Sequence, residues 1–168
     1  VTINGVGSVT LSGENARRVV DITGGTVNLN SLTITGGSTS GNGGGVNIGN
    51  LATVTIANST VSGNTANNGG GIRNSGSLSI TSSSISGNSA PSSGGGIDNT
   101  GSVSISNSTI SGNSAFTGGG INNTSSGSLS ITSSSISTNS ATNRGGGIYN
   151  NGSVSISNST ISGNSANN

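Results

Sequence analysis

Aliphatic and hydroxyl-bearing residues alternate in short runs along the chain. In the run SVSIS, Val103 and Ile105 are separated by serines, which is the period-two pattern of a β-strand with one buried face. The next aliphatic residue, Ile110, has the other parity, which predicts a bend near Asn107. The preceding motif GGGI-x-N places Ile97 inward in another short strand. Since nothing shows the 3.6-residue period of a helix, we expect strands joined by tight bends.

The pattern repeats along the chain. Triple glycines recur every 24 to 27 residues, and within each repeat two aliphatic positions stay seven residues apart. One such rung holds too few aliphatic residues to be stable alone, whereas stacked rungs share a continuous core. Stacking aligns four inward columns: Val54/Leu78/Val103/Leu129/Val154, Ile56/Ile80/Ile105/Ile131/Ile156, Val61/Ile85/Ile110/Ile136/Ile161 and Val46/Ile72/Ile97/Ile121/Ile148.

These columns predict an all-β fold: a right-handed, single-stranded parallel β-helix, or β-solenoid. We expect about six coils of 24–27 residues, with three short strands in each coil. Right-handed winding follows from the preferred hand of parallel crossovers. A single domain spans 1–168, with less regular coils at 1–42 and regular repeats at 43–168. In the irregular part Val27, Leu29 and Ile34 are in phase with the later rungs.

Small and polar residues recur at the bends. Asn107 and its equivalents tolerate the left-handed backbone of a tight bend, and the glycines suit close approach between backbones. Columns of serine and alanine, Ser59/Ser83/Ser108/Ser134/Ser159 and Ala66/Ala90/Ala115/Ala141/Ala166, fill the tight corners. Stacked amides bond along a column, so a structural ladder is expected at Asn64, Asn88, Asn113, Asn139 and Asn164.

The composition excludes several classes of function. Four basic and three acidic residues give a net charge of +1, which makes no basic stripe for nucleic acid. The chain has no His and no Cys, which excludes zinc and thiol chemistry. No apolar run approaches the roughly 20 residues of a membrane-spanning helix. We therefore expect no nucleic-acid partner, no membrane insertion, no metal and no cofactor. The Ser/Thr/Asn/Gly bias favours an exported protein.

The few charged residues offer little for catalysis. Glu14 and Asp21, flanked by Arg17 and Arg18, are compatible with a substrate clamp, but a corner salt-bridge cluster is the favoured interpretation. Asp98 occupies a position that varies between repeats, and we expect it to face outward. General acid–base catalysis needs paired carboxylates or a perturbed histidine, and serine nucleophiles need a base. The sequence predicts no catalytic residue and no enzyme.

Outward positions carry regular hydroxyl groups. The simplest interpretation is a solvent-exposed face without a binding role, whose residues retain strand propensity. The alternatives are an ice-binding surface, which most of these serines disfavour because they lack a methyl group, and a glycan-binding surface. The candidate surface ladder comprises Thr55, Ser79, Ser104, Ser130, Ser155, Thr60, Thr109 and Thr160.

The repeat GGGI-x-N-x-GSVSISNSTISGNSA resembles that of right-handed parallel β-helix exoproteins of bacterial surfaces, both polymorphic outer-membrane-protein-like and autotransporter-passenger-like. The opening VTINGVGSVTLSGENARRVVDITGGTVNLNSLTITGG resembles the start of their helical region. The resemblance covers essentially the whole chain and implies an extracellular or cell-surface location with an adhesive or structural role. Polysaccharide lyases and hydrolases resemble the chain in fold only. A polysaccharide-processing enzyme scaffold whose catalytic site lies outside this chain is therefore one hypothesis, which ranks third after the two given below.

The chain begins on an inward-facing strand and stops in mid-pattern at SANN. Bare solenoid ends expose strand edges, so we expect either the remainder of a longer β-helix or head-to-tail stacking of copies into filaments. The first hypothesis is a non-enzymatic, extracellular structural or adhesive protein. The second is an ice-binding or glycan-binding module, with surface glycans as partners.

Overall fold

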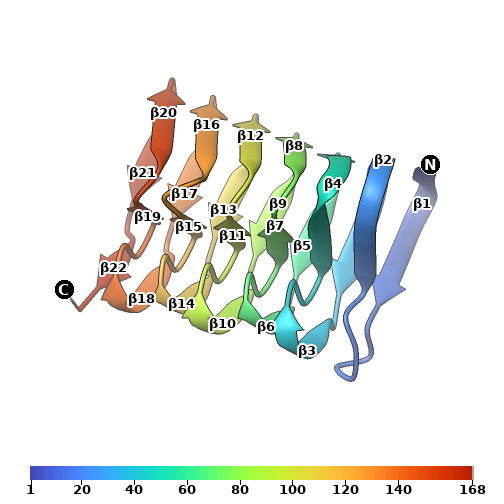
Figure 1. Cartoon of the computed structure of the whole chain (residues 1–168), viewed down its shortest axis with the longest axis horizontal. Helices are drawn as coiled ribbons and strands as arrows, with labels where there is room; N and C mark the ends of the chain where they lie inside the picture. Colours follow the sequence, from blue (N-terminus) through green and yellow to red (C-terminus); the bar gives the residue numbers. More distant parts are fainter. Residues whose placement is uncertain (168) are drawn as a thin grey trace.

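The structure, a computed structural model, describes residues 1–167 and contains 22 strands and no helix in that range. The strands wind into a rod in which each turn lies directly on the preceding one (Figure 1). Every strand pair that the structure describes is parallel. This arrangement confirms the predicted β-solenoid. It has about seven turns rather than about six, because the N-terminal strand adds a turn.

Equivalent strands of successive turns form four walls, which we name A, B, C and D. Within each regular turn the chain passes through wall D first and then through walls A, B and C. Wall A is the longest and lies at the top of Figure 1. It contains β1 (Thr2–Ser12), β2 (Val20–Thr35), β4 (Val46–Ala57), β8 (Ser77–Thr81), β12 (Ser102–Ser106), β16 (Ser128–Thr132) and β20 (Ser153–Ser157).

The other walls contain shorter strands. Wall B continues the ends of β1 and β2 with β5 (Thr60–Ser62), β9 (Ser84–Ser86), β13 (Thr109–Ser111), β17 (Ser135–Ser137) and β21 (Thr160–Ser162). Wall C contains β3 (Ser38–Asn42), β6 (Thr65–Asn68), β10 (Ser89–Ser93), β14 (Ser114–Thr117), β18 (Ser140–Arg144) and β22 (Ser165–Ala166). Wall D continues the start of β4 with β7 (Ile72–Asn74), β11 (Ile97–Asn99), β15 (Ile121–Asn123) and β19 (Ile148–Asn150).

Each regular turn therefore has four strands, one more than the sequence pattern predicts. The additional strand is the one in wall C, where only one inward residue, such as Ala115, marks the alternation. A single small aliphatic residue gives too weak a period-two signal to be distinguished from a corner.

The inward columns form the core. Their isoleucines, leucines and valines are buried in all turns but the last, with Ile80 and Ile105 paired side by side. Val27, Leu29 and Ile34 of β2 pair with the equivalent residues of the next turn, which confirms the predicted phase of the N-terminal part. Leu32 is buried where later turns have serine.

The corners have the backbone that the sequence predicts. Asn58, Asn107 and Asn158 have φ of 49–51°, and the serines that replace asparagine in alternate turns, Ser82 and Ser133, have φ of 49° and 50°. Short polar side chains tolerate this left-handed region.

The triple glycines lie where neighbouring backbones touch. Gly94 has φ of 63°, and a Cβ on Gly95 would lie 2.4 Å from the Ser114 carbonyl oxygen and 2.5 Å from that of Gly119. Only glycine fits such an approach, so the predicted role of these glycines is confirmed.

Candidate functional site

A buried asparagine ladder joins the turns at the corner between walls B and C. The amide oxygen of Asn88 accepts hydrogen bonds from both the backbone N–H and the side-chain Nδ2 of Asn64, each at 3.0 Å. The side-chain nitrogen of Asn88 in turn donates to the Val61 carbonyl and to Asn113. The pattern continues through Asn139 to Asn164. Each amide thus satisfies a corner N–H that no strand partner could reach.

A second asparagine ladder, which the sequence analysis missed, lies between walls D and A. Asn74 donates to Asn99, Asn99 to Asn123 and Asn123 to Asn150, at 2.7–2.8 Å. The first three of these side chains are fully buried. The invariant spacing of the last residue in GGGI-x-N was the available signal, since an asparagine that recurs every turn must stack on its equivalent.

The corner serines are also more than space fillers. The hydroxyl of Ser83 accepts the backbone N–H of Ser59 at 3.1 Å, and Ser108 does the same for Ser83. Every buried side-chain nitrogen or oxygen in residues 1–167 has a hydrogen-bond partner. The polar interior is therefore fully paired and supplies rigidity.

The candidate surface ladder divides between two walls. Thr55, Ser79, Ser104, Ser130 and Ser155 lie in register on wall A. Thr60, Thr109 and Thr160 lie on wall B, with Ser84 and Ser135 in the intervening turns. All eight candidates are half-buried or exposed, as expected for outward positions.

On wall B the ladder is longer than the sequence pattern predicts. Thr33 pairs with Thr60, and Thr10 pairs with Thr33, so the column covers seven turns. A second column of hydroxyls runs parallel to it, two residues further along each strand. These two columns, which we name the hydroxyl array, comprise Thr10/Thr33/Thr60/Ser84/Thr109/Ser135/Thr160 and Ser12/Thr35/Ser62/Ser86/Ser111/Ser137/Ser162.

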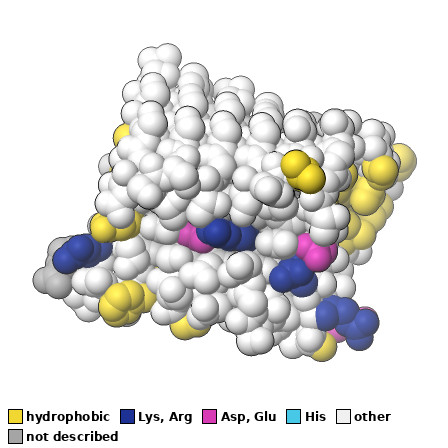
Figure 2. All heavy atoms as spheres, in the orientation of Figure 1, with side chains coloured by type: hydrophobic (Ala, Val, Ile, Leu, Met, Phe, Trp, Pro, Cys, Tyr) yellow, Lys and Arg dark blue, Asp and Glu magenta, His cyan; other side chains and the backbone are white. Residues whose placement is uncertain are grey.

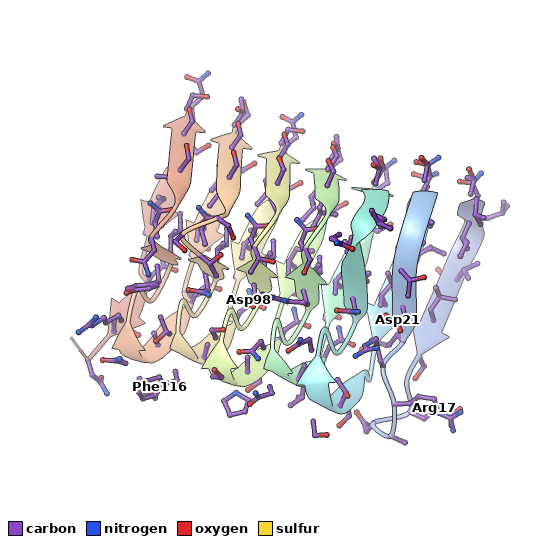
Figure 3. The ribbon with its side chains drawn as sticks, viewed as in Figure 1. Arg17, Asp21, Asp98 and Phe116 are labelled. Carbon is purple, nitrogen blue, oxygen red and sulfur yellow. The ribbon has the colours of Figure 1, made fainter. Side chains whose placement is uncertain are left out.

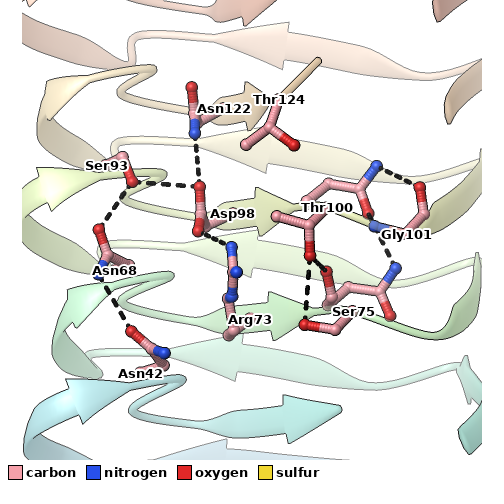
Figure 4. A network of polar contacts seen from close by, with 12 residues as sticks. Asn42, Asn68, Arg73, Ser75, Ser93, Asp98, Thr100, Gly101, Asn122 and Thr124 are labelled. Atoms are coloured by element: carbon pink, nitrogen blue, oxygen red, sulfur yellow. Dashed lines mark hydrogen bonds and ion pairs between the residues drawn. The ribbon is translucent and has the colours of Figure 1, made fainter. Parts of the chain in front are cut away.

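Asp98 does not face solvent, contrary to the expectation from the sequence. Its side chain is 3% exposed and forms an ion pair with Arg73 of the preceding turn. It also accepts hydrogen bonds from Ser93 Oγ at 3.1 Å and from Asn122 Nδ2 (Figure 4). The prediction was wrong because stacking brings the variable position of one turn against those of its neighbours. Arg73 and Asp98 occupy the same position in consecutive repeats, and their opposite charges were the feature of the sequence that indicated an ion pair between turns.

This network extends along wall C, through the last residues of its strands. Ser93 also donates to Asn68, which donates to Asn42 in the turn before (Figure 4). Figure 2 shows charged side chains gathered in a band along the rod on this face. The register places Asp21, Asn47, Arg73, Asp98, Asn122 and Tyr149 in one column, which we name the polar column.

The two ends of the polar column differ. At the N-terminal end Asp21 forms an ion pair with Arg18 at 3.1 Å and accepts a hydrogen bond from Asn47, as the salt-bridge interpretation predicts. Glu14 instead lies exposed in a left-handed loop, with φ of 53°. At the other end, the Asn151 side chain hydrogen-bonds to the Tyr149 phenol and, together with Arg144, lowers the pKa of that phenol.

Within residues 1–167, no three His, Cys, Asp or Glu side chains come close enough to bind a metal ion together. The same residues contain no helix of the length and hydropathy needed to cross a membrane. Comparison of the chain with protein-family models, with curated proteins and with solved structures gives no match.

Proposed function

We propose that this chain is a non-enzymatic structural and adhesive β-solenoid of a bacterial cell surface. The observation that supports it is the continuous parallel pairing of the stack. From β1 to β20, wall A pairs each turn with the next, with one register shift between β1 and β2 and one between β2 and β4. Such a stack is a rod about 34 Å long at ~4.8 Å per turn.

The outward faces suit contact with surfaces. Side chains on walls A and B are mostly uncharged hydroxyls, repeated at the spacing of the turns. Because every turn presents the same groups, many weak contacts add along the rod, as in multivalent binding. The paired asparagine and serine ladders keep these groups in fixed positions.

The rod also has the means to stack end to end. In the turn formed by β19–β22, Val154, Ile156 and Ile161 are 41%, 41% and 48% exposed, although their equivalents in earlier turns are buried. We propose that a further solenoid turn covers these residues, and that in the purified chain it comes from a second copy. Such a head-to-tail contact propagates into filaments.

Small-angle scattering across a concentration series tests the stacking. We expect the wild-type rod to lengthen in steps of about 34 Å, and Ile156→Lys to remain a single rod because a charge cannot be buried unpaired in the contact. Ser155→Lys is the matched control, since it adds the same charge to the outward side of the same strand. Single rods of wild-type protein at every concentration would contradict stacking.

Display of the chain on a bacterial cell tests adhesion. Cells that carry the wild-type rod should be retained under flow on glass or polysaccharide films more than cells that carry Ile105→Asp, which is expected to unfold because it buries a charge. Equal retention of the two cell types would contradict the adhesive role.

The hydroxyl array supports a second candidate, a module that binds ice or glycans. Two parallel columns in seven consecutive turns form a regular surface that could order water or contact sugar hydroxyls. Thermal hysteresis and ice recrystallisation are the measurements for ice, and a glycan array is the measurement for sugars. If this candidate holds, Thr109→Tyr abolishes the signal, because the ring interrupts the array, while Ser104→Tyr on wall A leaves it intact.

A further inference from the structure

Wall C carries two apolar residues that break the repeat. Pro91 and Phe116 are the chain's single proline and single phenylalanine. Each follows the inward alanine of its turn, and those alanines, Ala90 and Ala115, pair directly between β10 and β14. The two odd residues are therefore neighbours on the outer side of adjacent strands.

These residues contribute nothing to the core. Phe116 is 51% exposed and Pro91 is also exposed. Asn67 and Thr142 occupy the same position in the turns on either side, so the solenoid accommodates a polar residue here. An exposed aromatic ring at a position that tolerates polar side chains points to contact with a partner.

The two residues border a shallow pocket of about 220 Å³. Figure 3 shows Phe116 on the outer side of the wall, directed away from the rod. Three hydroxyl-bearing residues line the same pocket: Ser89 and Ser114, whose oxygens lie 3.3 Å apart, and Thr142 of the next turn. The complete lining is Ser89, Ala90, Pro91, Ser114, Ala115, Phe116 and Thr142.

We propose that this pocket binds one ring of a neutral, pyranose-based glycan. The C–H face of a sugar ring packs on an aromatic ring, while hydroxyls at the sugar's edge hydrogen-bond to side-chain hydroxyls. The pocket offers both kinds of surface, together with the few polar groups that orient a ligand in an apolar site. No charged side chain lines it, which favours a neutral ligand.

Size distinguishes the sugar from a protein partner. A stable protein contact buries about 800 Å² on each side, whereas this pocket is formed by only seven residues from three strands. A polysaccharide needs no larger area, since successive rings extend along the wall. The inference rests on the adhesive part of the proposed function and names the class of surface that the rod contacts.

Proton NMR of the full-length chain tests the proposal, because one phenylalanine gives one set of ring signals. The probes are cellohexaose, xylohexaose and the N-acetylglucosamine hexamer. We expect at least one of them to shift the Phe116 ring signals, with a Kd on the order of 1 mM. Phe116→Ser should weaken that binding at least about tenfold, and Phe116→Trp should retain it.

Leu51→Ser is the matched control, since it removes another exposed apolar side chain, 78% exposed, from wall A. It should leave sugar binding unchanged. The proposal is overturned if no probe shifts the ring signals, or if Phe116→Ser binds as well as wild type. It is also overturned if the signals shift with protein concentration in the absence of sugar, because the partner is then a second copy. Measured in the Ile156→Lys background, which removes the proposed end-to-end contact, these outcomes are independent of filament formation and of cell retention.

Discussion

Residues 102–115 and 153–166 have the same sequence, SVSISNSTISGNSA, and lie in different surroundings. In the first copy Val103, Ile105 and Ile110 are at most 2% exposed. In the second copy the equivalent residues are 41–48% exposed. Both copies form the same first two strands with the same corner, so the local backbone follows from the sequence of a turn and the burial does not.

The difference comes from the number of neighbouring turns. In the first copy β12 pairs with β8 on one side and β16 on the other, whereas in the second copy β20 pairs with β16 alone. The solenoid is a one-dimensional array, in which each turn is stabilised by its contacts with the turns on either side. The same substitution made in each copy therefore measures how much one neighbouring turn contributes to the free energy of unfolding.

Removal of the same isoleucine should give the largest difference between the copies. Ile105→Ala leaves a cavity between two turns and should cost about 3 kcal/mol. Ile156→Ala removes a side chain that is 41% exposed and should cost about 1 kcal/mol. Guanidinium denaturation of dilute protein, followed by circular dichroism, measures both. Equal losses at the two sites would contradict the view that burial by a second neighbour decides the cost.

The asparagine ladder should show a smaller difference. Asn113 is buried and accepts two hydrogen bonds from Asn88, so Asn113→Ala leaves a buried N–H unpaired and should cost about 2 kcal/mol. Asn164 accepts the same two bonds from Asn139 but is half-buried. Water can replace it, and Asn164→Ala should cost about 1 kcal/mol.

Amide hydrogen exchange measures the protection of individual backbone amides along the asparagine ladder. The Asn88 amide should exchange faster in Asn113→Ala, and the Asn139 amide should change less in Asn164→Ala, because it already lies one turn from the end of the rod. If both amides keep their wild-type protection, the side-chain ladder does not hold the corners together.

Much of this fold could be predicted because the sequence repeat determines which residues face inward in every turn. Five repeats align the same inward residues, so a signal that is ambiguous in one turn becomes plain in the column, as at Val103 and Ile105. The strand in wall C was missed because its alternation depends on one alanine per turn, such as Ala115. The second ladder through Asn74 and Asn99 was equally visible in the repeat, but the hydrogen bonds between turns appear only when the stack is built.

The outward faces were less predictable, because their residues vary between repeats. Asp98 was expected outside because its position changes type from turn to turn, and the partner that buries it, Arg73, lies a full turn away. The juxtaposition of Pro91 and Phe116 likewise follows from register rather than from sequence spacing. Contacts between variable positions become clear only when the turns are stacked in their correct register.

The turns that lead into the two identical copies differ in the polar column, with Asp98 before the first and Tyr149 before the second. Asp98→Asn should cost about 1–2 kcal/mol, because it leaves the partly buried Arg73 without its counter-ion. The double substitution Arg73→Asn with Asp98→Asn should restore stability to within about 0.5 kcal/mol of wild type, since Asn122 already shows that the column accepts asparagine. A double variant as unstable as the sum of the single variants would show that the ion pair contributes nothing of its own.

The smallest expected effect lies in the turn between the two copies. Both copies contain a glycine with φ of 62° at the second corner, Gly112 and Gly163, and the intervening turn has Thr138 there with φ of 55°. A β-branched residue pays about 1–2 kcal/mol for this backbone, and the hydrogen bond from its hydroxyl to the Ser137 carbonyl at 2.7 Å is exposed and offsets little of that cost.

Thr138→Gly should therefore stabilise the rod by about 0.5–1 kcal/mol, after allowing for the extra freedom of glycine in the unfolded chain. Gly112→Thr, the reverse change in the first copy, should destabilise by about 1 kcal/mol. Thermal and guanidinium denaturation of both variants against wild type measure the pair. A loss of stability in Thr138→Gly would mean that the threonine hydroxyl outweighs the backbone strain, and that this corner differs from its equivalents in chemistry as well as in sequence. A gain would show that the corner geometry is imposed by the stacked turns on either side, since threonine keeps the left-handed backbone that its own side chain disfavours.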